Sequence, residues 1–236
     1  MRDIILLGMA REESTRHPNK MLRPFGDTTL FDIHLDLLHQ VATMENSPFT
    51  RVILALNKKD KRLWERAFWT IYHRKSPIIL VERNDWSVQG ATKPSELFHY
   101  LSDYEEPYVM RVNACFPLLK ADTLIKGAEF FKSHPKIKSM TCVKERKNWF
   151  WNPSDGKPLT LGDTTHTTMQ QSRAIYESVH CFHILNRQSI LNDVLWNLNR
   201  NDPYLYVLPE SIEFIDIDTE TEFQIAESVW NELHKI

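Results

Sequence analysis

Short, almost wholly apolar runs alternate along this chain with segments whose apolar residues recur at helical spacing. The runs predict buried strands, because strands covered on both faces lose polar alternation. They are IILLGM (4–9), VILAL (52–56), IILV (78–81), YVMRV (108–112), SMTCV (139–143), VHCFHI (179–184) and IEFIDI (212–217). The predicted helices are 28–42, 60–73, 94–103, 121–132 and 188–198. This order predicts an α/β fold, a largely parallel sheet with helices on both faces.

One region interrupts the alternation. Residues 144–178 are rich in turn residues and carry Trp149, Phe150 and Trp151. We interpret this region as an insertion or small lobe within a single domain, 1–236. The length of 236 residues, with 42% hydrophobic and 25% charged residues, fits one substantial core.

Composition narrows the classes of function. A formal net charge of −2 argues against a general nucleic-acid or membrane-surface binder, which would carry a basic excess. Three cysteines without metal-ligand spacing predict free thiols and a reducing compartment. The first apolar run is too short for a signal peptide or a membrane span. We therefore expect a cytosolic protein, with neither nucleic acid nor membrane as a partner.

The stretch AREESTRHPNK follows the first predicted strand and crowds three cations, Arg11, Arg16 and Lys20, into one loop. Like charges repel one another, so the pattern favours a bound anion, with phosphate as the first candidate. The loop lacks the glycines of a backbone phosphate cradle, so side chains would have to supply the charge. The alternative is a solvated surface loop in which Glu12 and Glu13 pair with the cations.

The segment FIDIDTETEF, starting at Phe214, carries two closely spaced carboxylates. In an extended strand Asp216 and Asp218 point to the same side. Thr219 and Glu222 fit a capping box, which predicts a helix starting directly after them. Neighbouring carboxylates repel unless a cation lies between them, and Mg²⁺ prefers such oxygen ligands. The alternative is that Asp218 only caps the helix and Asp216 is solvated.

Together these motifs resemble a known family. AREESTRHPNKML resembles the signature A-R-x-x-S-x-x-x-P-x-K-x-L of the sugar-acid cytidylyltransferases, the family of CMP-sialic acid synthetase and, more distantly, of CMP-KDO synthetase. FIDIDTETEF is similar to the family segment I-D-I-D-T-x-x-D-F/L. RVNACFPLLKADTL (111–124) is similar to Q-P-T-S-P-L-R, with Asn113 at the glutamine position. The resemblance covers nearly the whole chain, in the right order and spacing.

The resemblance implies a Rossmann-like nucleotidyltransferase fold and the transfer of CMP from CTP to a hydroxyl of an acidic sugar, with release of pyrophosphate. It implies that Arg11 and Lys20 hold the triphosphate and stabilise the leaving pyrophosphate, and that Asp216 and Asp218 hold Mg²⁺. The other nucleotide-binding candidates that it implies are Ala10, Ser14, Arg16, Arg83 and Asn113.

The chain departs from the family where the acceptor would bind. In CMP-sialic acid synthetases the arginine of an R-Q pair holds the sugar carboxylate, whereas this chain has Met169 and Gln170 there. Cys115 stands where the KDO enzymes carry a metal-binding aspartate, so the sialic acid branch matches better at that position. The weaker acceptor-binding candidates are Gln170, Arg173 and Tyr176. Substitute cations are Arg173, Lys144, Arg146 and Lys147, although KERK also fits a solvated charge run.

Two further expectations concern histidines and assembly. His180 and His183 are three residues apart, so in a regular strand they face opposite sides and cannot share a metal ion. The aromatic lobe is expected to form a homodimer contact, as the corresponding region does in the family. Two other functions stay open: a nucleotidyltransferase for another base or for a phosphonate or sugar-phosphate acceptor, and a degenerate subunit that only binds nucleotide.

Overall fold

The structure is a computed structural model that describes residues 2–12, 18–84, 92–162, 165 and 167–235. The elements in chain order are β1 (Ile4–Met9), β2 (Pro24–Phe25), β3 (Thr28–Thr29), α1 (Leu30–Thr43), β4 (Arg51–Leu56), α2 (Lys61–Arg74), β5 (Ile79–Glu82), α3 (Pro94–Leu97), the 3₁₀ helix η2 (His99–Asp103), β6 (Tyr108–Asn113), α4 (Ala121–Ser133), β7 (Met140–Arg146), η3 (Met169–Gln171), β8 (Ile175–Asn186), α5 (Arg187–Leu191), β9 (Tyr204–Val207), η4 (Ile212–Phe214) and α6 (Glu220–His234).

A seven-stranded sheet organises these elements in the order β5-β4-β1-β6-β8-β7-β9. β1 pairs in parallel with β4 and with β6, so the first apolar run lies between two strands that come later in the chain. β8 runs antiparallel to both of its neighbours, β6 and β7. The predicted α/β fold with a mostly parallel sheet is confirmed.

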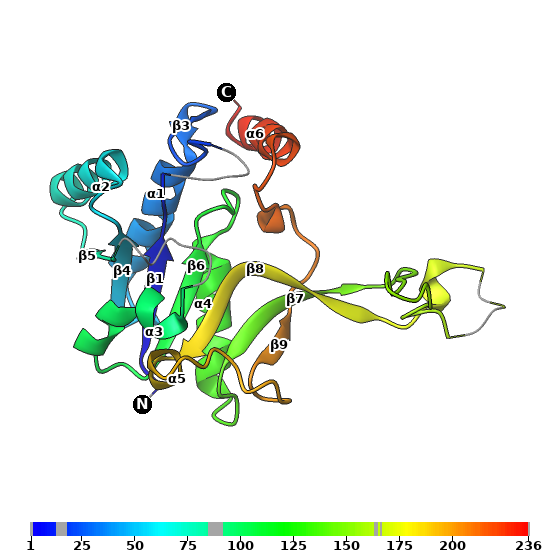
Figure 1. The fold of residues 1–236 in the computed structure, drawn as a ribbon. Helices are drawn as coiled ribbons and strands as arrows, with labels where there is room; N and C mark the ends of the chain where they lie inside the picture. The colour runs from blue at the N-terminus through cyan, green and yellow to red at the C-terminus, as the bar shows by residue number, and fades with distance from the viewer. Residues whose placement is uncertain (1, 13–17, 85–91, 163–164, 166, 236) are drawn as a thin grey trace.

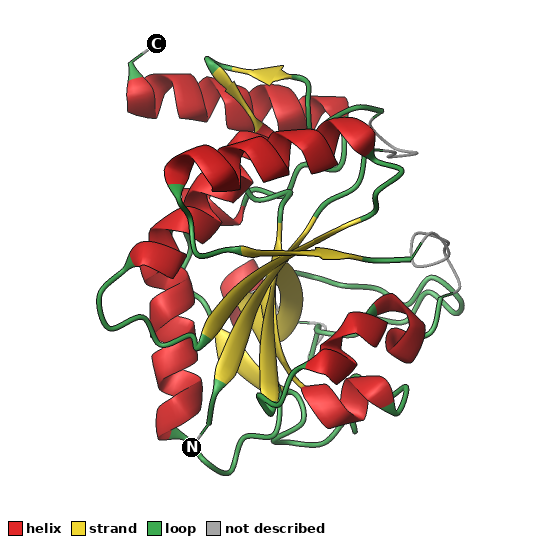
Figure 2. Ribbon diagram, turned by 90° about the vertical axis from the view of Figure 1, so that its left-hand side faces the viewer, coloured by secondary structure: helices red, strands yellow, loops and turns green. Residues whose placement is uncertain are grey.

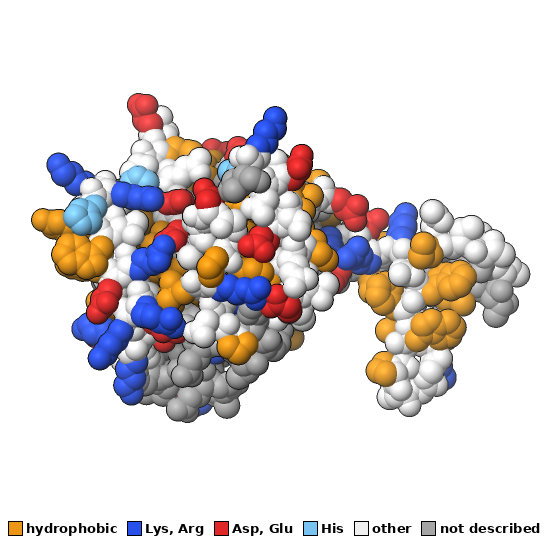
Figure 3. All heavy atoms as spheres, turned by 90° about the horizontal axis from the view of Figure 1, so that it is seen from above, with side chains coloured by type: hydrophobic (Ala, Val, Ile, Leu, Met, Phe, Trp, Pro, Cys, Tyr) orange, Lys and Arg blue, Asp and Glu red, His pale blue; other side chains and the backbone are white. Residues whose placement is uncertain are grey.

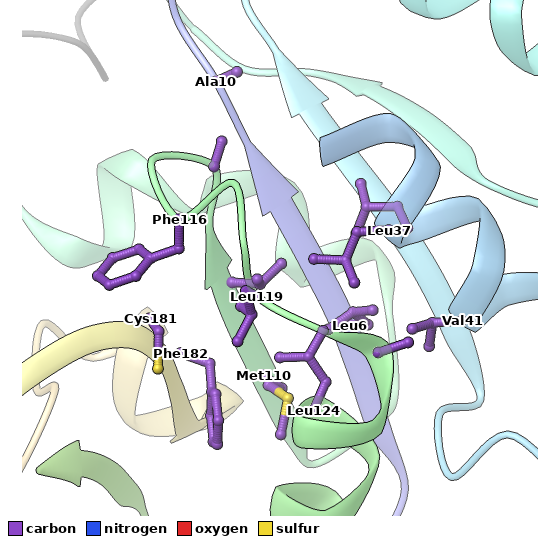
Figure 4. Close-up of a cluster of buried hydrophobic side chains, with 14 of the residues drawn as sticks. Leu6, Ala10, Leu37, Val41, Met110, Phe116, Leu119, Leu124, Cys181 and Phe182 are labelled. Carbon is purple, nitrogen blue, oxygen red and sulfur yellow. The ribbon is translucent and has the colours of Figure 1, made fainter. Parts of the chain in front are cut away.

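Hydrophobic side chains cover both faces of the sheet. On one face α1, α2, α4 and α6 pack over the larger cluster, part of which is drawn in Figure 4; Leu6 of β1, Leu124 of α4 and Phe182 of β8 meet there. On the other face η2 and α5 cover a smaller cluster. Figure 2 shows the sheet between these two groups of helices. Burial on both faces explains why the central strands read as continuous apolar runs.

The C-terminal part differs from the sequence-based prediction. The predicted strand 212–217 is wrong, because η4 occupies its first half and the remainder joins no sheet. Its backbone is held instead by a hydrogen bond from the Ile217 amide to the Cys115 carbonyl, at 3.0 Å. The edge strand beside β7 is β9, which the sequence pattern missed. Helix 94–103 is also divided, into α3 and η2, and helix 188–198 ends at Leu191.

The segment 144–178 forms an arm that projects from the body of the protein (Figure 1). β7 and β8 enter it as an antiparallel pair, with Arg146 opposite Ile175 at its outer end. The pairing register shifts between Thr141 and Val143, which marks a β-bulge where the arm leaves the sheet. Within the described residues, no helix is both long enough and apolar enough to cross a membrane.

Gly8 provides a test of how closely β1 packs against α1. A Cβ at Gly8 would lie 2.5 Å from His34 Nε2 and 2.6 Å from Leu38 Cδ1, both on α1. We predict that Gly8→Ala lowers the free energy of unfolding by about 1–3 kcal/mol, because the buried His34 and Leu38 side chains must shift. Urea denaturation measures this change. The control Gln40→Ala, on the exposed side of α1, should stay within about 0.5 kcal/mol of the parent; equal stability of all three proteins would contradict the close packing.

Candidate active site

The carboxyl ends of the parallel strands meet at one edge of the sheet, where open α/β sheets bind ligands. Ala10 and Arg11 follow β1, Arg83 follows β5, and Asn113 ends β6. The buried Arg83 donates a hydrogen bond from Nη2 to the Ala10 carbonyl at 2.8 Å. Arg83 therefore fixes the start of the first loop against the end of β5.

Lys20 joins this loop to the C-terminal segment. Its side chain is buried, and its Nζ donates to the Ile217 carbonyl at 2.5 Å. The same Nζ lies 3.4 Å from Asp218 Oδ1. An ammonium group is expensive to bury without such partners. The two motifs that stand at opposite ends of the sequence are thus in direct contact.

Both aspartates lie near the thiol of Cys115. Burial raises the pKa of that thiol, Lys20 opposes this shift, and the charges of Asp216 and Asp218 raise the pKa further. Two carboxylates and a lysine therefore surround one side chain at the end of β6. This donor set suits Mg²⁺, which takes one or two carboxylates and completes its shell with water and substrate phosphates. Among the described residues, no cluster of three or more His, Cys, Asp or Glu side chains could hold a metal by itself.

The predicted capping box at the start of α6 is confirmed. Thr219 Oγ1 accepts a hydrogen bond from the Glu222 amide at 3.3 Å. Glu222 Oε2 accepts from the amides of Asp218, at 2.9 Å, and Thr219, at 2.7 Å. These bonds fix the backbone on which the Asp218 carboxylate is carried.

Arg83, Tyr100 and Arg111 form a second cluster of donors beside β6, of which sequence reasoning singled out only Arg83. Burial lowers the pKa of Arg111, and the groups that act against that shift are Tyr100 and Cys115. Burial also lowers the pKa of Arg83, and the nearby Arg11 and Arg111 lower it further. Within the described part of the chain, Arg83 Nε and the Tyr100 hydroxyl have no hydrogen-bond partner. The arginine inside the apolar run YVMRV was the available sequence signal.

A groove of about 560 Å³ runs between the base of the arm and the segment before α6. It is lined by Lys144, Glu177, Ser178, Val179, His180, Phe214, Ile215, Asp216 and Glu222. Lys144 Nζ lies 3.3 Å from Glu177 Oε2. A small molecule in this groove would have Asp216 on one side and the base of β8 on the other.

Not every predicted site residue reaches this region. Gln170, Arg173 and Tyr176 are exposed on the arm and do not line the groove. Ser14 and Arg16 lie outside the described residues.

Two nucleotide-binding candidates are on the strand ends. Arg11 is exposed beside Arg83. Asn113 uses its side-chain oxygen to accept a hydrogen bond from the Cys115 amide at 3.1 Å. The Asn113 oxygen is therefore engaged in the turn after β6.

The expectation that His180 and His183 face opposite sides is wrong. Their rings are 5.4 Å apart, and His180 Nδ1 lies 3.4 Å from His183 Nε2. The cause is the bulge in β8, where His180 adopts a left-handed φ of 54°. A bulge interrupts the regular alternation of side chains on which the expectation rested.

Comparisons with known proteins show which solved structures share this fold. Neither a protein-family model nor a curated protein matches the sequence. Among solved structures, CMP:2-keto-3-deoxy-manno-octonic acid synthetase complexed with CTP is 11% identical, with a TM-score of 0.65, over 98% of this chain and 99% of that chain. The 4-diphosphocytidyl-2C-methyl-D-erythritol synthase of Anaerococcus prevotii is 12% identical, with the same TM-score of 0.65 and coverages of 98% and 99%. A cytidylyltransferase from Leptospira borgpetersenii is 15% identical, with a TM-score of 0.56 and coverages of 97% and 86%. The chain therefore has the nucleotidyltransferase fold that the motif resemblance implied.

The capping box generates a stability prediction. Thr219→Ala removes the side-chain acceptor for the Glu222 amide, and we expect a loss of about 1 kcal/mol in the free energy of unfolding. Thr219→Ser keeps the hydroxyl and should retain most of the stability. Denaturant unfolding monitored by circular dichroism compares the two variants. Equal losses in both would show that the hydroxyl does not stabilise α6.

Proposed function

We propose that this protein is a cytidylyltransferase that transfers CMP from CTP to a hydroxyl of an acidic sugar, a sialic acid or a related ulosonic acid, with release of pyrophosphate. One observation carries the proposal: Lys20 of the first loop contacts Ile217 and Asp218 at the carboxyl edge of the sheet. The contact joins a cation-rich loop to a pair of carboxylates, the two components that a nucleoside triphosphate and its metal require. The fold shared with enzymes that carry the name cytidylyltransferase supports it.

CTP would bind along the ends of β1, β5 and β6. Arg11 and Lys20 would bind the triphosphate, and Arg83 and Asn113 would contact the nucleoside. Side-chain cations serve this role because they neutralise phosphate charge and stabilise the leaving pyrophosphate. Ala10, Ser14 and Arg16 belong to the same loop and are further candidates for nucleotide contacts.

Asp216 and Asp218 would hold Mg²⁺, and their carboxylates near Cys115 suit such an ion. Bound there, Mg²⁺ would supply Lewis-acid polarisation of the α-phosphate. The protein's own contribution is then positioning and charge compensation, which dominates catalysis of phosphoryl-type transfer. In this scheme Lys20 limits the repulsion between the two aspartates and the incoming phosphates.

The acceptor would occupy the groove that contains Asp216. Lys144 lies in that groove and can attract the carboxylate of an acidic sugar in place of the arginine that the motif comparison finds missing. Its ion pair with Glu177 is partly exposed, so exchanging that partner for a substrate carboxylate costs little. A phosphonate or a sugar phosphate carries the same charge and is the alternative acceptor class.

The contacts of Asn113 bear on which nucleotide the protein would use. Its oxygen already accepts one hydrogen bond from the Cys115 amide, so its NH₂ group is the part of the side chain with all of its hydrogen-bonding positions available to a base. An NH₂ donor can bond a carbonyl oxygen of cytosine or of uracil. Transfer from UTP is therefore the alternative that the described contacts support.

We propose that the arm forms a homodimer contact. Its large apolar side chains are exposed, and Figure 3 shows them grouped on the arm, away from the body. They are Trp149, Trp151, Leu159, Met169 and Tyr176. Exposed aromatic residues gathered on one element are typical of interfaces.

The enzymatic proposal predicts Mg²⁺-dependent pyrophosphate release from CTP with one acceptor out of N-acetylneuraminate, KDO, related nonulosonic acids and simple phosphonates. UTP, ATP and GTP are tested in parallel. Chelation by EDTA should abolish release, and Asp216→Asn should lower kcat by about 100-fold or more, because a charge-stabilising group is lost. Glu210→Gln, an exposed carboxylate outside the groove, is the control and should keep parental activity. Measurable CTP binding without release for any pair would favour a binding-only subunit instead.

The proposed dimer contact predicts how a charged substitution on the arm changes the assembly. Trp151→Lys should shift the protein from dimer to monomer, because a charge would be buried in an apolar contact. Leu198→Lys alters an even more exposed apolar residue that lies outside the arm and should leave the assembly unchanged. Sedimentation velocity measures both masses. A parent protein that is monomeric at micromolar concentration would contradict the proposed dimer.

A further inference from the structure

His180 has a left-handed backbone, which is uncommon for residues that carry a Cβ. Its φ of 54° lies in the left-handed region, where a Cβ is disfavoured and where glycine, followed by asparagine, aspartate and histidine, is most often found. Strained residues and bulges concentrate at functional sites, where they redirect a side chain. Here the bulge places an exposed imidazole in the same groove as Asp216.

Two hydrogen bonds tie this imidazole to the interior. His180 Nδ1 lies 3.4 Å from His183 Nε2, and His183 Nδ1 lies 2.8 Å from Thr141 Oγ1. His183 and Thr141 are buried, whereas His180 is exposed. If each histidine donates from Nδ1, toward His183 and Thr141 respectively, Nε2 of His180 keeps a lone pair for the groove.

The buried histidine is suited to accept such a bond at all physiological pH values. Burial, followed by the charges of Arg111 and His180, lowers the pKa of His183 to about 3. Arg111 lies directly opposite His183 in the pairing of β6 with β8. His183 is therefore neutral, and its Nε2 can accept a hydrogen bond from His180 Nδ1.

We propose that His180 is the general base that takes the proton from the acceptor hydroxyl, and that His183 is the residue that positions it. This role rests on the proposed cytidylyltransferase function. As the hydroxyl oxygen bonds to the α-phosphorus, its proton passes to His180 Nε2. The bond from the α-phosphorus to the bridging oxygen breaks, and pyrophosphate leaves with the electron pair. The exposed imidazolium then returns its proton to solvent.

Charged groups on every side of the groove affect this step. Lys144, Glu177, Asp216 and Glu222 line the groove together with His180, and Arg111 lies opposite His183 in the neighbouring strand. An imidazole can take the proton only when it is neutral, so kcat should fall at acidic pH.

The first test needs no turnover. Long-range ¹H–¹⁵N correlation spectra of the labelled full chain, assigned with the His180→Asn and His183→Gln variants, report which ring nitrogen carries each proton. We expect a His180 tautomer protonated on Nδ1 and a neutral His183 between about pH 6 and 8. A His180 ring protonated on Nε2 would overturn the proposal, because no lone pair would then face the groove.

The second test is kinetic. His180→Asn keeps a residue that tolerates the left-handed backbone, and we expect kcat to fall about 100-fold or more, the KM for CTP to stay within about twofold, and the acidic limb of the pH profile to disappear. His183→Gln should shift that limb and lower kcat less. Lys75→Asn, at another left-handed position on the C-terminal end of α2, is the matched control and should leave kcat unchanged.

The outcomes separate the two proposals. If the parent protein releases pyrophosphate and His180→Asn keeps kcat within about threefold, the base assignment is overturned and the proposed function stands. If the parent protein releases none with any nucleotide and acceptor, the proposed function and the base assignment are both overturned. Thermal unfolding of each variant tests whether misfolding causes the lost activity, and His180→Asn should stay folded because asparagine tolerates the left-handed backbone.

Discussion

The rest of the site depends on the contacts of the buried Lys20 ammonium group. A buried cation must find acceptors, and it finds the Ile217 carbonyl and the Asp218 carboxylate. The contact draws the segment before α6 onto the carboxyl edge of the sheet, where an amide of the same segment bonds to Cys115. Together with this amide bond, the contact fixes the two aspartates relative to the loop after β1.

The same edge of the sheet holds buried hydrogen-bond donors that have no acceptor among the described residues. Arg83 Nε and the Tyr100 hydroxyl are buried, and the described residues offer them no hydrogen-bond partner. Leaving such groups unsatisfied costs about 1–3 kcal/mol each, a cost that a bound anion or carbonyl oxygen would remove. A ligand that offers such an acceptor would therefore bind more favourably by removing this cost.

Local patterns in the sequence predicted local structure well. The apolar runs gave the strands at 4–9 and 52–56, and Thr219 with Glu222 gave the start of α6, because burial and capping act over a few residues. The predicted strand 212–217 was wrong because an alternating pattern cannot reveal whether a pairing partner exists. The bulge at His180 and the position of Arg111 opposite His183 depend on strand pairing across the sheet, which one sequence does not display.

The most direct test is a double-mutant cycle on CTP affinity by isothermal titration calorimetry, using Lys20→Met, Asp218→Asn and the double variant, each with and without Mg²⁺. We predict that each single variant weakens Mg²⁺-dependent binding and that the double variant departs from additivity by at least about 0.5 kcal/mol, because both side chains act on one triphosphate and metal. CTP affinities that are independent of Mg²⁺ and equal in all four proteins would contradict a triphosphate site at this junction.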